Sequence, residues 1–325
     1  MPAICHIAFE TSCQFCYSSR FSHYRYHIVN ITILGPGAVG TLYAYKLHQA
    51  GHNVSVWGRT ATDTVTISID QSPEVALANR SRCALKQCDL LIVTLKAWQV
   101  EQALTPLLSE LDSDTILLFL HNGLGTVDRL ARLLEAHPVL LGTTTHGALK
   151  QSAINVKHTG LGQTLIGGWN DKGRQCKFVA EVMNHAFAPV KWHPEVEVAL
   201  WTKLVINCAI NPLTAIHQCQ NGQLAASQFS QTIYSVIDEA VDCANVVGIS
   251  LNREALHTTV YDVITATAQN YSSMHQDIYN KRQSEIDFIS GYLVSIAEHH
   301  GIAIPTNLAL YNQIKQIESS WSSHD

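Results

Sequence analysis

Three polar side chains recur every fourth residue in an otherwise apolar segment. They are Lys203, Asn207 and Asn211, and this spacing places them on one face of a helix. An ammonium group held against an apolar wall has a lowered pKa and can donate a proton to an alkoxide. We therefore expect Lys203 to act as a general acid, with a buried polar stripe at a domain interface as the alternative. Pro212 disfavours the helical conformation for the residue before it, so we expect the helix to end at Asn211.

A second polar constellation lies in the segment Asn270-Tyr271-Ser272-Ser273-Met274-His275-Gln276. Ser273 with Gln276 three residues later has the form of a capping box, which predicts that Ser273 is the N-cap of a helix. The free N–H groups of such a first turn bind carboxylates, although a cap without a ligand is the alternative. We expect Glu285 on the same helix, either as a solvated residue or as the acid that orients a lysine.

A glycine-rich segment, Gly35-Pro36-Gly37-Ala38-Val39-Gly40, follows a predicted strand and opens a helix predicted to run to about Gly51. In this context the spacing is typical of a loop that binds the pyrophosphate of a dinucleotide. Gly35 permits the tight turn, Gly37 lets the backbone approach the anion, and Gly40 allows close helix packing. The alternative is a glycine-rich turn that binds nothing.

The residues after the second predicted strand indicate which dinucleotide is bound. A site for NAD usually has an acidic residue there, which accepts hydrogen bonds from the ribose hydroxyls. This chain has Arg59 in that region and no acid before Asp63. Arg59 suits a 2′-phosphate, with an ordinary solvated arginine as the alternative. Lys96 and Asn122 follow two further predicted strands, and ligands of such sheets bind beyond the carboxyl ends of the strands.

The elements that position these residues alternate between short apolar strands and helix-length stretches from residue 31 onward. This alternation predicts a doubly wound α/β domain, in which helices cover both faces of a parallel sheet. From about residue 195 the apolar period of 3.6 predicts a domain made only of helices. The expected strands are Ile31–Leu34, Asn53–Trp57, Leu90–Leu95, Thr115–Leu120 and Val139–Thr143, and the expected helices of the second domain are Leu200–Ile210, Ser230–Val247, Arg253–Gln269 and Ser273–His300.

The composition fits two folded domains. The chain has 325 residues, of which 46% are hydrophobic, so each domain can bury a core. A formal charge of −5 without a basic run argues against nucleic acid or anionic lipid as a partner. The apolar runs stop at about six residues, where a membrane span needs about 20. Nine cysteines, an odd number, favour a reducing compartment, and we expect a cytoplasmic protein.

We divide the chain into three parts. Residues 1–29 lack a clear period, and we expect them to be a disordered extension that is dispensable for folding. Residues 30–194 are expected to form a Rossmann-type nucleotide-binding domain, and residues 195–325 a helical substrate domain. Cys13 and Cys16 form a CxxC in the extension, but a zinc ribbon needs a second pair at suitable spacing, so we expect no metal.

The chain from Ile31 to about Glu318 resembles the ketopantoate reductase (2-dehydropantoate 2-reductase) family. The resemblance implies an NADPH-dependent reduction of the keto group of 2-dehydropantoate to the alcohol of pantoate, a step toward pantothenate and coenzyme A. It implies a small keto acid as the substrate. We expect a monomer or homodimer. The matching strings are Leu-Gly-x-Gly-Ala-x-Gly, Val93-Thr94-Leu95-Lys96-Ala97-Trp98-Gln99, His121-Asn122-Gly123, Gly142-Thr143-Thr144-Thr145-His146, Lys203-Leu204 through Asn211-Pro212-Leu213-Thr214-Ala215, Ser272-Ser273-Met274 and Glu285-Ile286-Asp287.

The resemblance also implies roles for individual residues. Lys203 resembles the proton donor of the family, and Glu285 resembles an acid that contacts the cofactor and helps to fix the catalytic site. The cofactor-binding residues implied for NADPH are Gly35, Pro36, Gly37, Ala38, Val39, Gly40, Arg59, Lys96, Asn122, Ala148 and Glu285. The substrate-binding residues implied are Lys203, Asn207, Asn211, Asn221, Asn270 and Ser273.

Two other functions remain open from the sequence. One is a reductase of the same architecture that acts on another branched 2-keto acid, because these residues recognise the keto acid head better than its tail. The other is a non-enzymatic NADPH-binding sensor. Lys203 argues against the sensor, because a protein that only binds the dinucleotide has no use for a proton donor.

Overall fold

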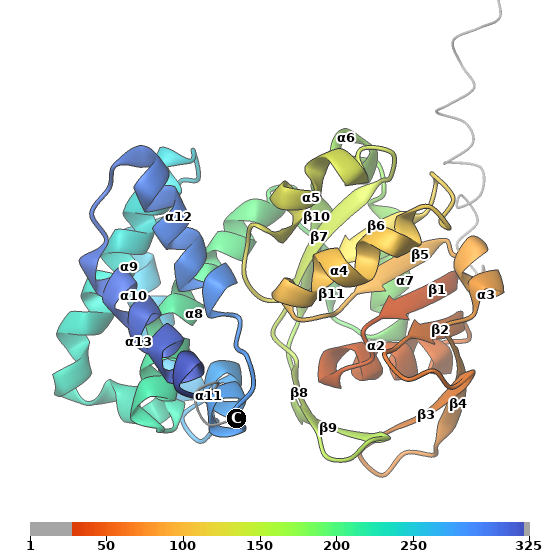
Figure 1. Ribbon diagram of the computed structural model, residues 1–325, viewed down its shortest axis with the longest axis horizontal. Coiled ribbons are helices and arrows are strands. Elements are labelled where there is room, and N and C mark those ends of the chain that lie inside the picture. Colours follow the sequence, from red (N-terminus) through yellow and green to blue (C-terminus); the bar gives the residue numbers. More distant parts are fainter. Residues whose placement is uncertain (1–27, 322–325) are drawn as a thin grey trace, which may run out of the picture.

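The computed structural model describes residues 28–321, which form two lobes side by side (Figure 1). One lobe is built on an eleven-stranded sheet, and the other consists of helices. This is the α/β arrangement that the sequence predicts, a Rossmann-type sheet followed by a helical domain. Residues 1–27, with Cys13 and Cys16, lie outside the described residues. Val29, which we counted with the extension, is buried in the core of the sheet domain.

The centre of the sheet consists of the strands that the sequence predicts. Strands β2 (Asn53–Trp57), β1 (Asn30–Leu34), β5 (Leu90–Val93), β6 (Ile116–Phe119) and β7 (Val139–Thr144) are neighbours in this order and all parallel. β1, β5 and β6 are buried along almost their whole length. Such strands form continuous apolar runs in the sequence, which is why they could be recognised.

The parallel sheet that the sequence predicts is extended at both edges by strands that the sequence does not predict. The full order is β11-β10-β7-β6-β5-β1-β2-β4-β3-β9-β8, and the pairs β3–β4, β8–β9 and β7–β10 are antiparallel. Several of these outer strands mix buried and exposed residues, so no apolar run marks them. The strands that the sequence missed are β3 (Thr64–Ile69), β4 (Val75–Asn79), β8 (Gly147–Lys150), β9 (Asn155–Gly160), β10 (Thr164–Gly168) and β11 (Val190–Trp192).

Helices cover both faces of the sheet, as a doubly wound fold requires. On one face, side chains of α2 and α7 share an apolar core with the sheet. On the other face, side chains of α4 and α5 form a second core with the sheet. The helices of this domain are α2 (Ala38–Gln49), α3 (Arg82–Lys86), α4 (Ala97–Leu108), α5 (Thr126–Leu134), α6 (Asp171–Arg174) and α7 (Phe178–Ala186).

The helical domain is built around α8 (Val196–His217), which packs against α9, α10, α11 and α13 and also contacts β7 and β10. Among residues 28–321, α8 is the one helix long and apolar enough to cross a membrane, but 67% of its most apolar stretch is buried inside the protein. It therefore behaves as a core helix. The remaining elements are η1 (Asn221–Ala225), α9 (Ser227–Val246), α10 (Arg253–Ala266), α11 (Ser273–Tyr279), η2 (Ile286–Phe288), α12 (Ser290–His300) and α13 (Pro305–Trp321).

Two expectations about these helices are wrong. α8 does not end at Asn211 but continues through Pro212 to His217. Leu213 and Ala215, beyond the proline, are buried in the domain core, and this packing offsets the hydrogen bond that proline cannot form. The segment Ser273–His300 is not one helix, because α11 ends at Tyr279 and a loop follows. Glu285 lies after this loop, directly before η2.

Candidate active site

The glycine loop between β1 and α2 has the geometry of an anion-binding turn. Gly35 has φ +92°, and a Cβ atom there would lie 2.5 Å from Cδ2 of Leu95. A Cβ atom at Gly40 would lie 2.3 Å from the carbonyl oxygen of Gly35. At Gly37 a Cβ atom would meet only that same oxygen, at 4.0 Å. The backbone at Gly37 therefore faces open space, while Gly35 and Gly40 are required by close packing.

These features fit the pyrophosphate of a dinucleotide. No side chain of the described residues caps the amino terminus of α2, and its first turn contains no acidic residue. The first N–H groups of the helix are therefore available to an anion, at the positive end of the helix dipole. The segment Gly35–Gly40 can hold the pyrophosphate in the way that the sequence predicts.

The end of β2 lies against this loop. The N–H of Gly35 donates to the carbonyl oxygen of Trp57 at 3.1 Å. Gly58 approaches Pro36 so closely that a Cβ atom on Gly58 would lie 3.2 Å from Cγ of Pro36. Arg59 follows directly and is exposed. Arg59 thus lies beside the glycine loop, at the edge of the sheet where the ribose of a bound dinucleotide would lie.

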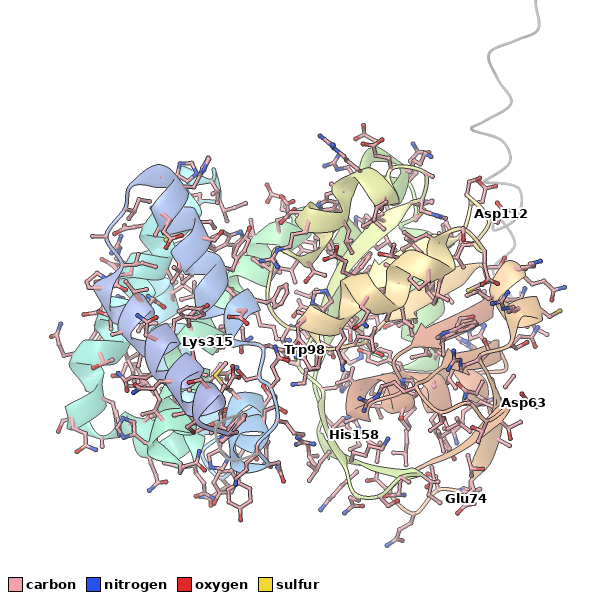
Figure 2. The ribbon with its side chains drawn as sticks, viewed as in Figure 1. Asp63, Glu74, Trp98, Asp112, His158 and Lys315 are labelled. Atoms are coloured by element: carbon pink, nitrogen blue, oxygen red, sulfur yellow. The ribbon has the colours of Figure 1, made fainter. Side chains whose placement is uncertain are left out.

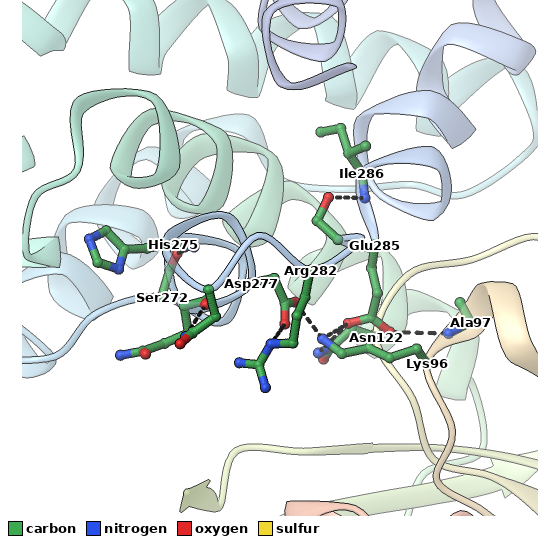
Figure 3. A network of polar contacts seen from close by, with 12 residues as sticks. Lys96, Ala97, Asn122, Ser272, His275, Asp277, Arg282, Glu285 and Ile286 are labelled. Atoms are coloured by element: carbon green, nitrogen blue, oxygen red, sulfur yellow. Dashed lines mark hydrogen bonds and ion pairs between the residues drawn. The ribbon is translucent and has the colours of Figure 1, made fainter. Parts of the chain in front are cut away.

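A polar network around Lys96 joins the two domains (Figure 3). The ammonium nitrogen of Lys96, at the amino end of α4, lies 2.7 Å from Oδ2 of Asp277 and 3.3 Å from Oε2 of Glu285. Glu285 also accepts hydrogen bonds from the N–H of Ala97 at 3.2 Å and from Nδ2 of Asn122 at 3.3 Å. Two carboxylates of the helical domain therefore bind the loops that follow β5 and β6.

The charges in this network are mutually stabilised. Burial alone would lower the pKa of Lys96, but the carboxylates of Glu285 and Asp277 together raise it above its usual value. Burial raises the pKa of Asp277, and the ammonium group of Lys96 partly offsets this effect. Lys96 is therefore charged throughout the physiological range. The network brings together Lys96, Asn122 and Glu285, three of the residues that the sequence singled out.

Lys203 extends from α8 to the sheet domain, where its ammonium nitrogen donates to the carbonyl oxygen of Thr144 at 2.8 Å. Burial lowers the pKa of Lys203 to about 8, and the charge of Glu285 opposes this shift. Burial also lowers the pKa of His121, on which the charges of Glu285 and Lys203 act in opposite directions. Lys203 thus lies in an electrostatically coupled cluster at the domain junction, and its ammonium group can donate a proton there.

The face of α8 that carries Lys203 continues with Asn207 and Asn211, one and two turns further on. Asn207 is partly exposed, and Asn211 is 6% exposed. Within residues 28–321, neither side-chain amide forms a hydrogen bond with a protein group. Both amides can therefore donate to a small polar ligand held beside Lys203.

The other predicted substrate residues surround the start of α11. The N–H of Asn221 donates to the carbonyl oxygen of Asn270 at 2.9 Å, and Nδ2 of Asn221 donates to Oγ1 of Thr267 at 2.9 Å. Ser273 is exposed, but it is not the cap of α11. The N-cap is Ser272, whose Oγ accepts from the N–H of His275 at 3.0 Å. The predicted cap is wrong by one residue, because Ser272 keeps an extended backbone and the helix begins after it.

The predicted cofactor-binding residues do not all contact one another. Ala148 lies on β8 and packs against the apolar core that contains α2. Lys96 binds carboxylates of the helical domain, and Arg59 stands apart beside the glycine loop. Sequence reasoning missed Asp277 and Thr144, the partners of the two lysines. Asp277 is separated from Lys96 by 181 residues, and no spacing in the sequence connects the two.

Two family models match this chain. Residues 31–171 match the model described as "Ketopantoate reductase PanE/ApbA", and residues 195–318 match "Ketopantoate reductase PanE/ApbA C terminal". A curated 2-dehydropantoate 2-reductase of Vibrio cholerae serotype O1 is 53% identical over 294 residues, which are 90% of this chain and 99% of the relative. The similarity therefore spans both domains.

Solved structures show the same two-domain fold. A PanE/ApbA family ketopantoate reductase from Ralstonia eutropha JMP134 has a TM-score of 0.80 at 26% identity, over 90% of this chain and 99% of the other. D-mandelate dehydrogenase, in a ternary structure with NADH and anilino(oxo)acetate, has a TM-score of 0.83 at 24% identity, over 90% and 99% of the two chains. The second likeness concerns the fold alone. Because the family models and the relative cover both domains, this protein belongs to the PanE/ApbA family of ketopantoate reductases.

Proposed function

We propose that this chain reduces 2-dehydropantoate to pantoate with NADPH, and that Lys203 is the proton donor. The observation that carries the proposal is the position of Lys203 at the domain junction, with a pKa lowered to about 8. Asn207 and Asn211 lie on the same helix face, and their side-chain amides have no protein hydrogen-bond partner in the described part of the chain. Membership of the family supports 2-dehydropantoate as the substrate, and these residues support the assignment of the proton donor.

Reduction of a keto group requires a hydride on the carbon and a proton on the oxygen. When bound, the reduced nicotinamide supplies the hydride. Negative charge then develops on the former keto oxygen, and the ammonium group of Lys203 stabilises this charge and transfers its proton there. The carbonyl oxygen of Thr144 orients the ammonium group, and the charge of Glu285 favours its protonated form.

The remaining predicted residues receive binding roles. The segment Gly35–Gly40 holds the pyrophosphate, Arg59 binds the 2′-phosphate, and Ala148 contacts the nicotinamide side. Lys96, Asn122 and Glu285 fix the junction between the two domains and contact the cofactor there. The substrate head is held by amide and hydroxyl donors of the helical domain, namely Asn207, Asn211, Asn221, Asn270 and Ser273.

The fold alone does not select the substrate, because a mandelate dehydrogenase shares it and was solved with NADH. The test is therefore turnover on a panel of 2-keto acids, followed by the loss of reduced-nicotinamide absorbance. We expect the highest kcat/KM with 2-dehydropantoate and NADPH. A higher value with 2-oxoisovalerate or benzoylformate would replace the substrate assignment, and binding of NADPH without any turnover would favour the sensor.

Two further features belong to the proposal. We place the protein in the cytoplasm, which agrees with the buried free thiols of Cys88, Cys176 and Cys208, whose pKa values burial raises to about 11, 12 and 12. We also propose a monomer or homodimer. Light scattering on the purified chain during gel filtration tests the second statement, and a mass above that of a dimer would contradict it.

A further inference from the structure

A second arginine, Arg80, lies at the same edge of the sheet as Arg59. Arg80 directly follows β4, which runs parallel to β2 with Asn79 opposite Val56. Parallel strands end at the same edge of a sheet, so Arg80 lies at the edge where β2 meets the glycine loop. The N–H of Arg80 donates to the carbonyl oxygen of Val56 at 3.0 Å, which fixes the residue to β2.

The side chain of Arg80 extends over the end of β2. Its guanidinium carbon lies 5.9 Å from the centre of the ring of Trp57, two residues before Arg59. Arg80 has φ +54°, a left-handed conformation that side chains other than glycine and asparagine seldom adopt. The chain therefore has a long cationic residue at a position where glycine or asparagine would be less strained.

Asn79 connects this position to the segment that carries Arg59. Its side chain is buried, and its Oδ1 accepts from the N–H of Gly58 at 2.9 Å. Its Nδ2 donates to the carbonyl oxygens of Thr60 at 3.0 Å and Thr62 at 2.7 Å. Asn79 thus binds the backbone on both sides of Arg59 and fixes that segment beside Arg80.

In the part of the chain that the structure describes, the two arginines have no anionic partner. Both are exposed, and within residues 28–321 neither forms an ion pair with a carboxylate. Asp63, at the outer edge of the sheet domain (Figure 2), contributes its carbonyl oxygen to the N–H of Asn79 at 2.8 Å, but its carboxylate binds neither arginine. Two unpaired guanidinium groups at one edge form a site for a strongly charged anion.

We infer that Arg80 is a second recognition residue for the 2′-phosphate of the dinucleotide, together with Arg59, and that Asn79 positions the Arg59 segment. The inference rests on the proposed use of NADPH. A phosphate monoester carries about −1.5 to −2 charges near neutral pH, so one guanidinium group leaves much of its charge unbalanced. The alternative is that Arg80 only packs on Trp57.

The test measures the affinity of two cofactor fragments by calorimetry, 2′,5′-ADP and 5′-AMP, which differ in the 2′-phosphate. The variants are Arg80→Asn, which tolerates the left-handed backbone, and Arg80→Lys, which keeps the charge. Arg82→Ala is the matched control, because Arg82 is exposed on the next helix and pairs with Glu110. We expect Arg80→Asn to lower the affinity for 2′,5′-ADP by about tenfold or more and to leave the affinity for 5′-AMP unchanged. Arg80→Lys should retain part of the preference for 2′,5′-ADP over 5′-AMP.

The possible outcomes distinguish the use of NADPH from the role of Arg80. A wild-type chain that binds both fragments equally would overturn the use of NADPH, and this inference with it. A wild-type chain that prefers 2′,5′-ADP, with the same preference in Arg80→Asn, would overturn the role of Arg80 alone. Equal weakening of both fragments with a lowered Tm would assign Arg80 to packing on Trp57, which also overturns the inference.

Discussion

The ammonium nitrogen of Lys203 lies 2.8 Å from the carbonyl oxygen of Thr144, across the boundary between the two domains. Thr144 is the last residue of β7, and Lys203 belongs to α8. The bond holds the proposed proton donor at the carboxyl edge of the sheet, where ligands of doubly wound folds bind. Trp98, in the first turn of α4, also lies at the junction of the two lobes (Figure 2). The chemistry therefore depends on how the helical domain meets the sheet.

Replacing Lys203 should separate chemistry from cofactor binding. We expect Lys203→Ala to lower kcat by about 10² to 10⁴, because a positioned proton donor is lost. The Kd for NADPH should change little, since the glycine loop lies in the other domain. Steady-state kinetics and fluorescence titration check both values, with the exposed Lys191→Ala as the control. A folded variant with undiminished kcat would remove Lys203 from the mechanism.

The rate should fall at alkaline pH. Lys203 donates a proton only while it is protonated, and burial lowers its pKa to about 8. We expect kcat/KM for reduction to be level below about pH 8 and to fall about tenfold per pH unit above it. Lys96 does not produce this limb, because its pKa is raised above the usual lysine value. A profile that stays level to pH 10 would contradict the assignment.

Glu285→Gln should move this alkaline limb. The carboxylate of Glu285 raises the pKa of Lys203 against the effect of burial, so its removal lowers that pKa further. We expect kcat/KM to begin its decline at a lower pH than in the wild-type chain. Glu254→Gln, on an exposed acid of α10, is the control and should leave the profile in place. An unchanged profile in Glu285→Gln would show that the two residues are not coupled.

Two glycines of the phosphate loop should respond differently to alanine. Gly40→Ala places a methyl group 2.3 Å from the carbonyl oxygen of Gly35, and we expect a loss of about 1–3 kcal/mol in the free energy of unfolding. In Gly37→Ala the new methyl group faces open space, so the Tm should not change. The affinity for NADPH should fall by about tenfold or more, because the backbone there approaches the pyrophosphate. Thermal melts and titrations check both. Equal NADPH affinity in Gly37→Ala and the wild-type chain would contradict the phosphate role.

Lys96 and Asp277 should be energetically coupled. The variant Lys96→Met removes the ammonium group of the 2.7 Å contact between the domains, and Asp277→Asn removes the negative charge of its partner. In a double-mutant cycle on the free energy of unfolding, we expect a coupling of about 0.5–3 kcal/mol, because both side chains are partly or fully buried. The exposed pair Arg174 and Asp171 is the control and should give less than about 1 kcal/mol. Additive effects of Lys96→Met and Asp277→Asn would show that the pair does not hold the domains.

Local sequence patterns determined the central part of this fold. Among the five strands of the parallel core, β5 and β6 are continuous apolar runs because neighbours cover both of their faces. Helices α8, α9 and α10 show the 3.6-residue period of amphipathic or buried helices. The glycine loop is a local motif, since its turn, its open backbone and its helix start lie within six residues, Gly35–Gly40. The common face of Lys203, Asn207 and Asn211 follows from helical geometry alone.

Tertiary structure decided the rest. The outer strands β3, β4, β8, β9, β10 and β11 take their places in the sheet through tertiary contacts, such as the pairing of β3 with β9 between residues 87 positions apart. Several of these strands mix buried and exposed residues, so their local signal is weak. α8 continues through Pro212 because the packing of Leu213 and Ala215 outweighs a local preference. The partners of the two lysines, Asp277 and Thr144, are 181 and 59 residues away from Lys96 and Lys203. Burial and opposite charge set the pKa of each lysine, and both depend on which distant groups the folded chain brings within a few ångströms.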